Sequence, residues 1–460
     1  MIKLLKKGSA IIGVDGAIAY TILSRIIQAG GGVVTLLFVA RSLSKIEQGY
    51  YYTFGSILAI QIFFELGLTN IITQFVAHET ARIEWNDKVS FTGSEEAASR
   101  LSSLLRFTLK WFVVIAFLLF IGLYIAGNYF FGKFGNENVN DGAAVLVEWQ
   151  KPWVILSFIT VLSLILSPIL AFLEGLGRVK DVAKIRLIQQ IAQLLLVLVF
   201  FSVGFKLFST PVAAVISTFL VIGWVLFSDI RRLLFFIWNK KGEYNVNYKL
   251  EIFPFQWKIA LSWISGYFIF QLFNPVLFAE EGAVVAGQMG MTLAVLNAIL
   301  MFSLSWINTK IPVLSNLIAR KEYTQLDSLF NKSLFQSTMI NLFATSMFFV
   351  VIFLLRYFDI KFNGKNFADR FLPLTAMLFM IITIVLNHVI AAWATYLRSH
   401  KQEPMMIQSV VIGFLCCVST IVLGKKFGLY GMTLGYMVIT IFSFIWTYII
   451  FKTKKSAWHE

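Results

Sequence analysis

Polar side chains recur at helical spacing inside stretches that are otherwise apolar. Thr21, Arg25, Gln28, Gly32 and Thr35 follow one another in steps of four and three residues, so a helix places them on one face. In lipid such a face is tolerated mainly where it meets a partner helix or a wet cavity, because an unpaired polar group is costly in hydrocarbon. These residue types offer hydrogen bonding and charge pairing to a polar ligand.

Four further stretches carry similar stripes, which are rich in amides and aromatic rings. Their members are Gln61, Glu65, Thr69 and Thr73; Arg186, Gln190 and Gln193; Trp263, Tyr267, Gln271 and Asn274; and Asn297, Ser305 and Asn308. Both halves of the chain therefore present hydrogen-bonding stripes within apolar surroundings.

Three ionisable residues inside these stretches each allow two interpretations. A charge near the middle of a membrane helix costs about 2.5 to 3.5 kcal/mol. Arg25 therefore either pairs with Glu65 or reaches the cytoplasmic interface, or it is a cation that meets an anionic substrate. Glu65 is either a pairing partner or a proton or sodium site. His388 is either a buried, hydrogen-bonded histidine or a proton carrier.

No catalytic chemistry is evident in the sequence. Gly127 to Phe134 spells G-x-x-x-x-G-K, but Phe134 stands where a magnesium-binding Ser or Thr belongs and no strand precedes it, so we do not interpret it as a P-loop. The four histidines, His78, His388, His400 and His459, are scattered. We expect no enzyme activity, no catalytic residues, no cofactor and no metal site.

The elements that must position these stripes are membrane helices. The chain is 58% hydrophobic and 14% charged, with a mean hydropathy of +0.77, which excludes a water-soluble fold. A helix of about 20 apolar residues crosses about 30 Å of hydrocarbon. We predict twelve such spans, near residues 17–40, 49–75, 111–132, 153–173, 185–204, 211–229, 257–279, 283–307, 335–355, 371–396, 405–423 and 428–451.

The net charge of +15 is explained by topology. Lysines and arginines concentrate in alternate connections, which places both termini in the cytoplasm and makes nucleic-acid binding unnecessary as an explanation. The basic start lacks a compact apolar core followed by a small-residue cleavage site, so we expect the first span to be retained.

The two halves of the chain show faint self-similarity. At an offset of 238 residues Gly49 matches Gly287 and Asn70 matches Asn308. We therefore predict two six-helix lobes related as parallel repeats, residues 1–230 and 257–460, joined by a cytoplasmic linker at 231–256, with a short basic tail at the end. Such pairs commonly enclose a site between them.

Several connections carry strings that point to one superfamily. They are FELGLTNIITQFVAHETAR at 64–82, EGLGRVKDVAKIRLIQQI at 174–191, GAVVAGQMG at 282–290, SWINTKIPVLSNLIARKEYTQLDSLF at 305–330 and GLYGMTLGY at 428–436. In order and placement the chain resembles the polysaccharide-export and O-antigen (Wzx-type) flippases of the multidrug/oligosaccharidyl-lipid/polysaccharide (MOP) exporter superfamily. The 77–109 connection is longer than is usual for that family, and spans three and four match none of its strings.

This resemblance implies a function. The chain would move a polyprenyl-diphosphate-linked oligosaccharide from the cytoplasmic to the outer leaflet of a bacterial inner membrane, by alternating access. Its partners would be membrane lipids, this lipid-linked cargo, a polysaccharide polymerase and a chain-length regulator. On this hypothesis Arg25 meets the diphosphate, Trp263 and Tyr267 stack on sugars, and the sugars receive hydrogen bonds from Gln28, Gln61, Gln190, Gln193, Gln271, Asn274, Asn297 and Asn308.

Three alternatives remain open. A multidrug exporter of the same superfamily predicts a cavity dominated by carboxylates, whereas Glu65 is the one clear acid deep in a predicted span. An integral-membrane polysaccharide polymerase predicts a large outward loop with charged catalytic residues. A scaffold for a biosynthetic complex would not need polar stripes in both halves.

Overall fold

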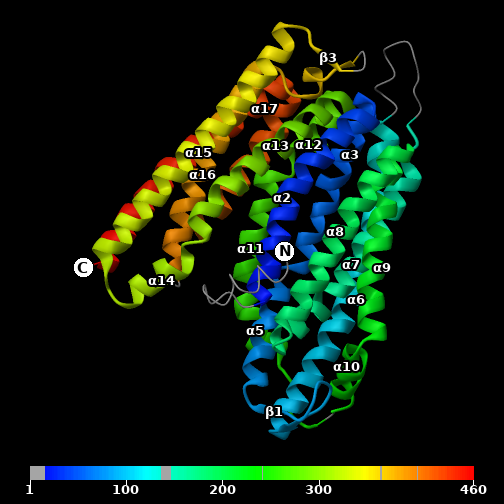
Figure 1. Ribbon diagram of the computed structural model, residues 1–460, viewed down its shortest axis with the longest axis vertical. Helices are drawn as coiled ribbons and strands as arrows, with labels where there is room; N and C mark the ends of the chain where they lie inside the picture. Colours follow the sequence, from blue (N-terminus) through cyan, green and yellow to red (C-terminus); the bar gives the residue numbers. More distant parts are fainter. Residues whose placement is uncertain (1–15, 136–146, 241, 363–364, 401, 460) are drawn as a thin grey trace, which may run out of the picture. The chain divides into compact units, whose positions relative to one another are not determined.

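The protein is almost entirely helical, as seen in a computed structural model (Figure 1). The structure describes residues 16–135, 147–240, 242–362, 365–400 and 402–459. Within these ranges nothing is described of the side chains of residues 16–19, 21, 22, 25, 26, 29, 255, 258, 362 and 365. Arg25, the most prominent candidate in the sequence, therefore has a described helical backbone and no described side chain.

The α-helices follow one another along the chain with few interruptions. They are α2 (Gly16–Ser42), α3 (Lys45–Leu58), α4 (Ile62–Glu65), α5 (Leu68–Thr80), α6 (Glu95–Phe134), α7 (Gln150–Gly175), α8 (Val179–Val203), α9 (Ser209–Phe227), α10 (Asp229–Asn239), α11 (Phe253–Phe270), α12 (Phe273–Glu280), α13 (Ala283–Asn308), α14 (Ile311–Ala319), α15 (Tyr323–Tyr357), α16 (Leu374–Ser399) and α17 (Met406–His459). Single turns complete them: the 3-10 turns η1 (Ala59–Gln61), η2 (Lys206–Phe208) and η4 (Ala368–Arg370), and the π-helical turn η3 (Tyr248–Ile252).

Two small antiparallel hairpins interrupt the helices. In the first, β1 (Ile83–Trp85) pairs with β2 (Phe91–Gly93), so that Ile83 lies opposite Gly93. In the second, β3 (Lys361–Phe362) pairs with β4 (Lys365–Asn366).

Each of the twelve predicted windows coincides with a helix or a bent helix pair. In the part of the chain that the structure describes, eight helices are long and apolar enough to cross a membrane, or ten if each of two bent pairs is one span. The described Gly30–Ser42 part of α2 is a shorter apolar helix, and α17, with 54 residues, covers the last two windows. The prediction of an all-α integral membrane protein is confirmed, and the side on which the termini lie stays a prediction.

The length of α17 is explained by a kink at Gly428. A helix of 54 residues would be about 80 Å long, far more than one crossing requires. Gly428 has φ 56° and ψ −142°, outside the helical region, and a Cβ there would lie 1.6 Å from Oε1 of Glu281. The Glu281 carboxylate accepts a hydrogen bond from the backbone N–H of Leu429, so it caps the helix that restarts there.

A break at Leu66 and Gly67 bends the second predicted span by 41°. Both residues are left-handed, with φ of 50° and 67°, a conformation that costs a residue with a Cβ about 1 to 2 kcal/mol. The segment between α3 and α5 is completed by η1 and the single turn α4. Gln61 and Glu65 both lie beside this break.

A second break bends the seventh predicted span by 40°. It falls at Gln271 and Leu272, between α11 and α12, four and three residues before Pro275. A proline ring collides with the carbonyl of the residue four positions earlier in a continuous helix, here Gln271. Pro275 therefore accounts for a break that lies one turn before it.

The helices pack into two compact units, each of which is built from several separate segments of the sequence. The first unit comprises the described part of Met1–Phe38 with Ile60–Gly132 and Glu148–Trp263, and the second comprises Val39–Ala59 and Ile264–Glu460 with the described residues of 133–147. The lobes expected at 1–230 and 257–460 stay a prediction, because packing and internal repetition are different properties of a chain.

In the first unit α5 lies against α7, and α8 lies against α7 and α9 (Figure 1). Trp153 on α7 is fully buried and donates from Nε1 to the carbonyl of Leu123 on α6, at 3.1 Å. The side chain of Arg100 joins α6 to Glu79 on α5, at 2.7 Å, and to Glu251 in η3. Hydrogen bonds and close packing hold membrane helices together where lipid removes the hydrophobic drive.

In the second unit α3 crosses α13 at a pair of glycines. A Cβ on Gly49 would lie 1.9 Å from the carbonyl oxygen of Ala283, and one on Gly287 would lie 2.9 Å from the backbone N of Gly49. Gln48 Nε2 donates to the carbonyl of Gly287 at 2.8 Å, and its Oε1 accepts from Arg370 at 3.0 Å. These contacts explain why residues 39–59 pack with the second unit.

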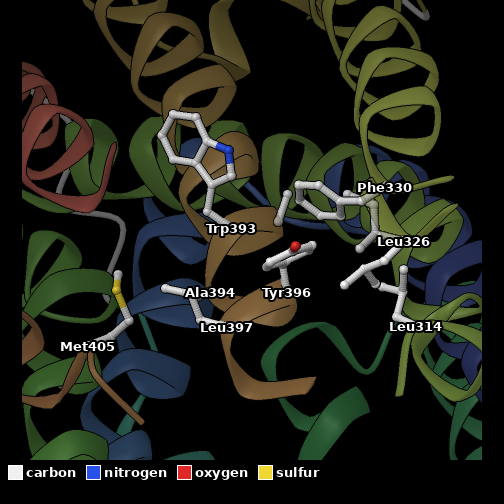
Figure 2. Packing of buried hydrophobic residues seen from close by; sticks show 10 residues of the cluster. Leu314, Leu326, Phe330, Trp393, Ala394, Tyr396, Leu397 and Met405 are labelled. Atoms are coloured by element: carbon white, nitrogen blue, oxygen red, sulfur yellow. The ribbon is translucent and has the colours of Figure 1, made fainter. Parts of the chain in front are cut away.

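The hydrophobic core of the second unit gathers where α13, α14, α15 and α16 meet (Figure 2). Its buried members are Ile307, Leu314, Leu326, Phe330, Ala392, Trp393, Ala394, Tyr396, Leu397 and Met405. The phenol ring of Tyr396 lies at its centre, 4.6 Å from Phe330 between ring centroids.

Candidate functional site

The candidate residues of the first unit lie on α2, on α8 and around the break before α5. The hydroxyl of Ser24 on α2 donates to Oε1 of Gln190 on α8. Two turns further along α2 and one turn further along α8, Gly31 lies so close to Leu194 that a Cβ would come within 2.7 Å of its Cδ2. Gln28 is exposed and Gln193 is half-buried, so the amides of this stripe remain accessible beside a close helix contact.

At the break in the second span, a carboxylate lies beside backbone that has left the helix. Glu65 accepts a hydrogen bond from the hydroxyl of Thr69. Thr73 continues the stripe by donating to the carbonyl of Ala171 on α7, at 3.1 Å. Gln61 and Glu65 are half-buried. An ion pair between Arg25 and Glu65 falls outside the described side chains and stays a prediction.

The indole of Trp263 belongs to the same neighbourhood. A Cβ on Gly67 would lie 2.4 Å from Cγ2 of Ile259 and 3.9 Å from Cε2 of Trp263. The middle of α11 therefore packs against the break that follows Glu65, and it places a half-buried aromatic ring there.

In the second unit two candidates are buried among helices. Tyr267 is 8% exposed and Asn274 is 6% exposed. Asn274 Nδ2 donates to the hydroxyl of Ser56 on α3 at 3.0 Å, while its Oδ1 has no hydrogen-bond partner among the described residues. Asn274 therefore joins α12 to α3, and its free carbonyl oxygen can accept a further hydrogen bond.

The remaining candidates of the second unit are more accessible. Gln271 is half-buried at the break between α11 and α12. On α13, Asn297 is exposed and Asn308 is half-buried at the last residue of the helix.

Sequence reasoning missed a polar row on α15. Ser333, Ser337, Asn341 and Thr345 follow steps of four residues and are all buried. Asn341 Nδ2 donates to the hydroxyl of Ser303 on α13 at 3.2 Å, whereas its Oδ1 has no partner within the described residues. The fourfold spacing was available in the sequence as a signal, and the structure shows that this row faces a partner helix.

His388 on α16 is fully buried, and neither ring nitrogen has a hydrogen-bond partner among the residues that the structure describes. His388 is therefore a core histidine, as one interpretation predicted, but the predicted hydrogen bond is not formed with any described residue. Within the described residues no group of three or more His, Cys, Asp or Glu could hold a metal ion.

Comparison with known proteins identifies the fold. No protein-family model matches the chain, and no curated protein matches it. Among solved structures, an inward-facing multidrug resistance MATE family transporter of the MOP superfamily matches with a TM-score of 0.61 at 13% identity, over 96% of this chain and 98% of that one. The lipid II flippase MurJ, in an inward closed conformation, matches with a TM-score of 0.55 at 15% identity, over 95% and 87%.

A third similar structure is a MOP superfamily transporter from Pyrococcus furiosus, with a TM-score of 0.51 at 13% identity over 97% and 96% of the two chains. The chain has the fold of MOP-superfamily transporters. At these identities the likeness concerns the fold alone, so any function must be argued from the residues.

Proposed function

We propose that this protein is a flippase that moves a polyprenyl-diphosphate-linked oligosaccharide from the cytoplasmic to the outer leaflet of a bacterial inner membrane. The observation that carries the proposal is the nature of the accessible candidate side chains within this fold. Gln28, Gln61, Gln193, Gln271 and Asn297 are exposed or half-buried amides. Amides both donate and accept hydrogen bonds, which suits the hydroxyl groups of a sugar.

The cargo explains why such residues are needed inside a membrane. An oligosaccharide with a diphosphate cannot cross hydrocarbon unaided, because each unpaired polar group costs several kcal/mol there. A transporter that offers hydrogen bonds to the headgroup while the lipid tail stays in the bilayer removes that barrier. An inside-negative potential favours outward movement of the diphosphate by about 2.3 kcal/mol per charge per 100 mV.

A multidrug exporter is the second candidate, because a MATE transporter matches the fold with a TM-score of 0.61. The partners and positions of the described carboxylates favour the flippase over the drug exporter. Glu47 and Glu79 are buried, but Glu47 caps the start of α3 and Glu79 pairs with Arg100. That leaves Glu65, which lies at a break inside a predicted span. A single carboxylate offers little negative charge for binding a cationic drug.

The leaflet position of the lipid-linked precursor tests the proposal. In a bacterial strain that lacks the gene, we expect precursor to accumulate in the inner leaflet and surface polysaccharide to fall. Restoring the gene with Arg25→Ala should fail to restore export if Arg25 meets the diphosphate, while Arg25→Lys should restore part of it. Normal outer-leaflet precursor in the deletion strain, with increased accumulation of cationic dyes, would instead favour the drug exporter.

A further inference from the structure

A cluster of titratable side chains covers the core shown in Figure 2, at the start of α15 and the ends of α16 and α17. The hydroxyl of Tyr396 on α16 donates to Oδ1 of Asp327 on α15 at 2.8 Å. Lys455 Nζ on α17 lies 2.8 Å from Oδ2 of the same carboxylate. The charge of Asp327 is therefore already matched by a lysine.

Two histidines face each other beside this triad. Nε2 of His400, just after α16, lies 3.4 Å from Nε2 of His459 at the end of α17. The ring of His459 stacks on Tyr323 of α15, with 4.1 Å between centroids and 13° between planes, and the ring of His400 lies 4.8 Å from Trp458. Aromatic contacts on both sides thus hold the two imidazoles edge to edge.

The surrounding hydrogen bonds indicate where the protons lie. Nδ1 of His400 is 3.1 Å from the carbonyl oxygen of Tyr396, which can only accept, so Nδ1 carries the proton. Neutral His400 then presents the lone pair of Nε2 to its partner. Nε2 of His459 completes the contact by donating its N–H, which His400 Nε2 shares with the hydroxyl oxygen of Tyr396, each at 3.4 Å.

The pair accepts one added proton but not two. A first proton on Nδ1 of His459 leaves the Nε2–H donor in place and makes the hydrogen bond charge-assisted. A second proton on Nε2 of His400 places two donors and two positive charges face to face. Lys455 pairs with Asp327 and so weakens the attraction of that carboxylate for the second charge. Among the described residues, the other neighbours named here, Tyr323 and Tyr396, carry no negative charge at neutral pH.

We propose that His400 and His459 form a proton-operated latch that holds the end of α17 against α15 and α16 and releases it when both imidazoles are charged. This inference concerns regulation at the end of the helix and stands independently of the cargo. Burial lowers the pKa of His400, against the opposing influence of the Tyr396 carbonyl and of Asp327. Because the folded pKa is depressed, the docked state is fully favoured above the ordinary histidine value of about 6.5, and it is lost as the pH falls through the folded value.

Hydrogen exchange of the full-length protein in nanodiscs tests the latch. Protection of the amides in 448–459, corrected for intrinsic exchange, should fall about tenfold or more between about pH 7.5 and pH 5 in the native sequence. His459→Gln keeps an N–H donor for His400, and His400→Gln keeps an acceptor for His459, but neither pair can take up two protons. In both variants protection should stay within about twofold over the same pH range.

His78→Gln is the matched control, because His78 is an exposed histidine on α5 of the first unit. It should show the same pH dependence as the native protein. Equal protection of 448–459 at the two pH values in the native protein would overturn the latch, and so would a loss of protection in both glutamine variants as large as in the native protein. The two variants act on opposite sides of the contact, so misfolding of one leaves the other as a test.

Discussion

Asn274 shows at the scale of one residue how a predicted ligand contact can also be a helix contact. Its amide donates to Ser56, and its carbonyl oxygen is buried without a partner among the described residues. Hydrogen bonds between membrane helices contribute about 0.6 kcal/mol on average in double-mutant cycles, so this contact alone gives modest stability. The unpaired oxygen is the part that a cargo can use.

We therefore predict different outcomes for the two sides of this hydrogen bond. Ser56→Ala and Asn274→Leu should each lower the free energy of unfolding by about 1 kcal/mol, with a coupling of about 0.6 kcal/mol in the double variant. Transport should fall in Asn274→Leu and stay near the native rate in Ser56→Ala. Thermal unfolding in detergent and a leaflet assay measure the two effects, and equal transport in both variants would reduce Asn274 to a structural role.

The sequence predicted the candidate site in part. Steps of three and four residues predicted a polar face on α8, and the structure shows Gln190 of that face accepting a hydrogen bond from Ser24 on α2, while its contact with sugars stays a prediction. Periodicity alone cannot distinguish a stripe that faces a cavity from one that faces a neighbouring helix, since both must be polar in lipid. The row from Ser333 to Thr345 belongs to the second kind, and Tyr267 and Asn274 are largely buried by neighbours.

At the scale of helices, the crossing of α3 and α13 depends on two glycines. The sequence paired Gly49 with Gly287 as equivalent positions of a repeat, and the structure places them in contact. Gly49→Ala should force the helices apart and lower the free energy of unfolding by about 1 to 3 kcal/mol. Gly55→Ala on the same helix is the control, because its Cβ would meet nothing within 4 Å, and it should be neutral or slightly stabilising. Similar melting temperatures for the two variants would refute this account of the crossing.

The break before α5 makes a second prediction for an element. Gly67→Ala adds backbone strain at φ 67° and a collision with Ile259, whereas Gly177→Ala adds strain at φ 83° in open space. We expect a loss of about 1 to 2 kcal/mol for Gly177→Ala and a larger loss, by about 1 to 3 kcal/mol, for Gly67→Ala. Combining Gly67→Ala with Ile259→Ala should relieve the collision and leave the backbone strain at residue 67. Unfolding measurements on these three variants check this, and equal losses for the two glycines would contradict it.

The positions of the helices were predictable and their interruptions were less so. Twelve apolar windows coincide with helices or bent pairs, because hydropathy and length dominate in a bilayer. Pro275 is a residue type that explains one break, but Leu66 in a left-handed conformation carries no compositional signal. That break is set by the packing of α11 on Gly67, which depends on contacts distant in sequence.

For the whole molecule, alternating access requires that the polar stripes meet water in some state. Single cysteines at Gln28, Gln61 and Asn297, in a background in which Cys416 and Cys417 are replaced, should react with a membrane-impermeant maleimide. Val199 and Phe343 are the controls, because they are 53% and 71% exposed on apolar helices long enough to cross a membrane, where we expect lipid contact. Their cysteine variants should stay unlabelled in intact membranes and react only after solubilisation. Because a polar stripe that only joins helices would also exclude the reagent, labelling no faster than at the two controls would show that the accessible amides serve packing alone.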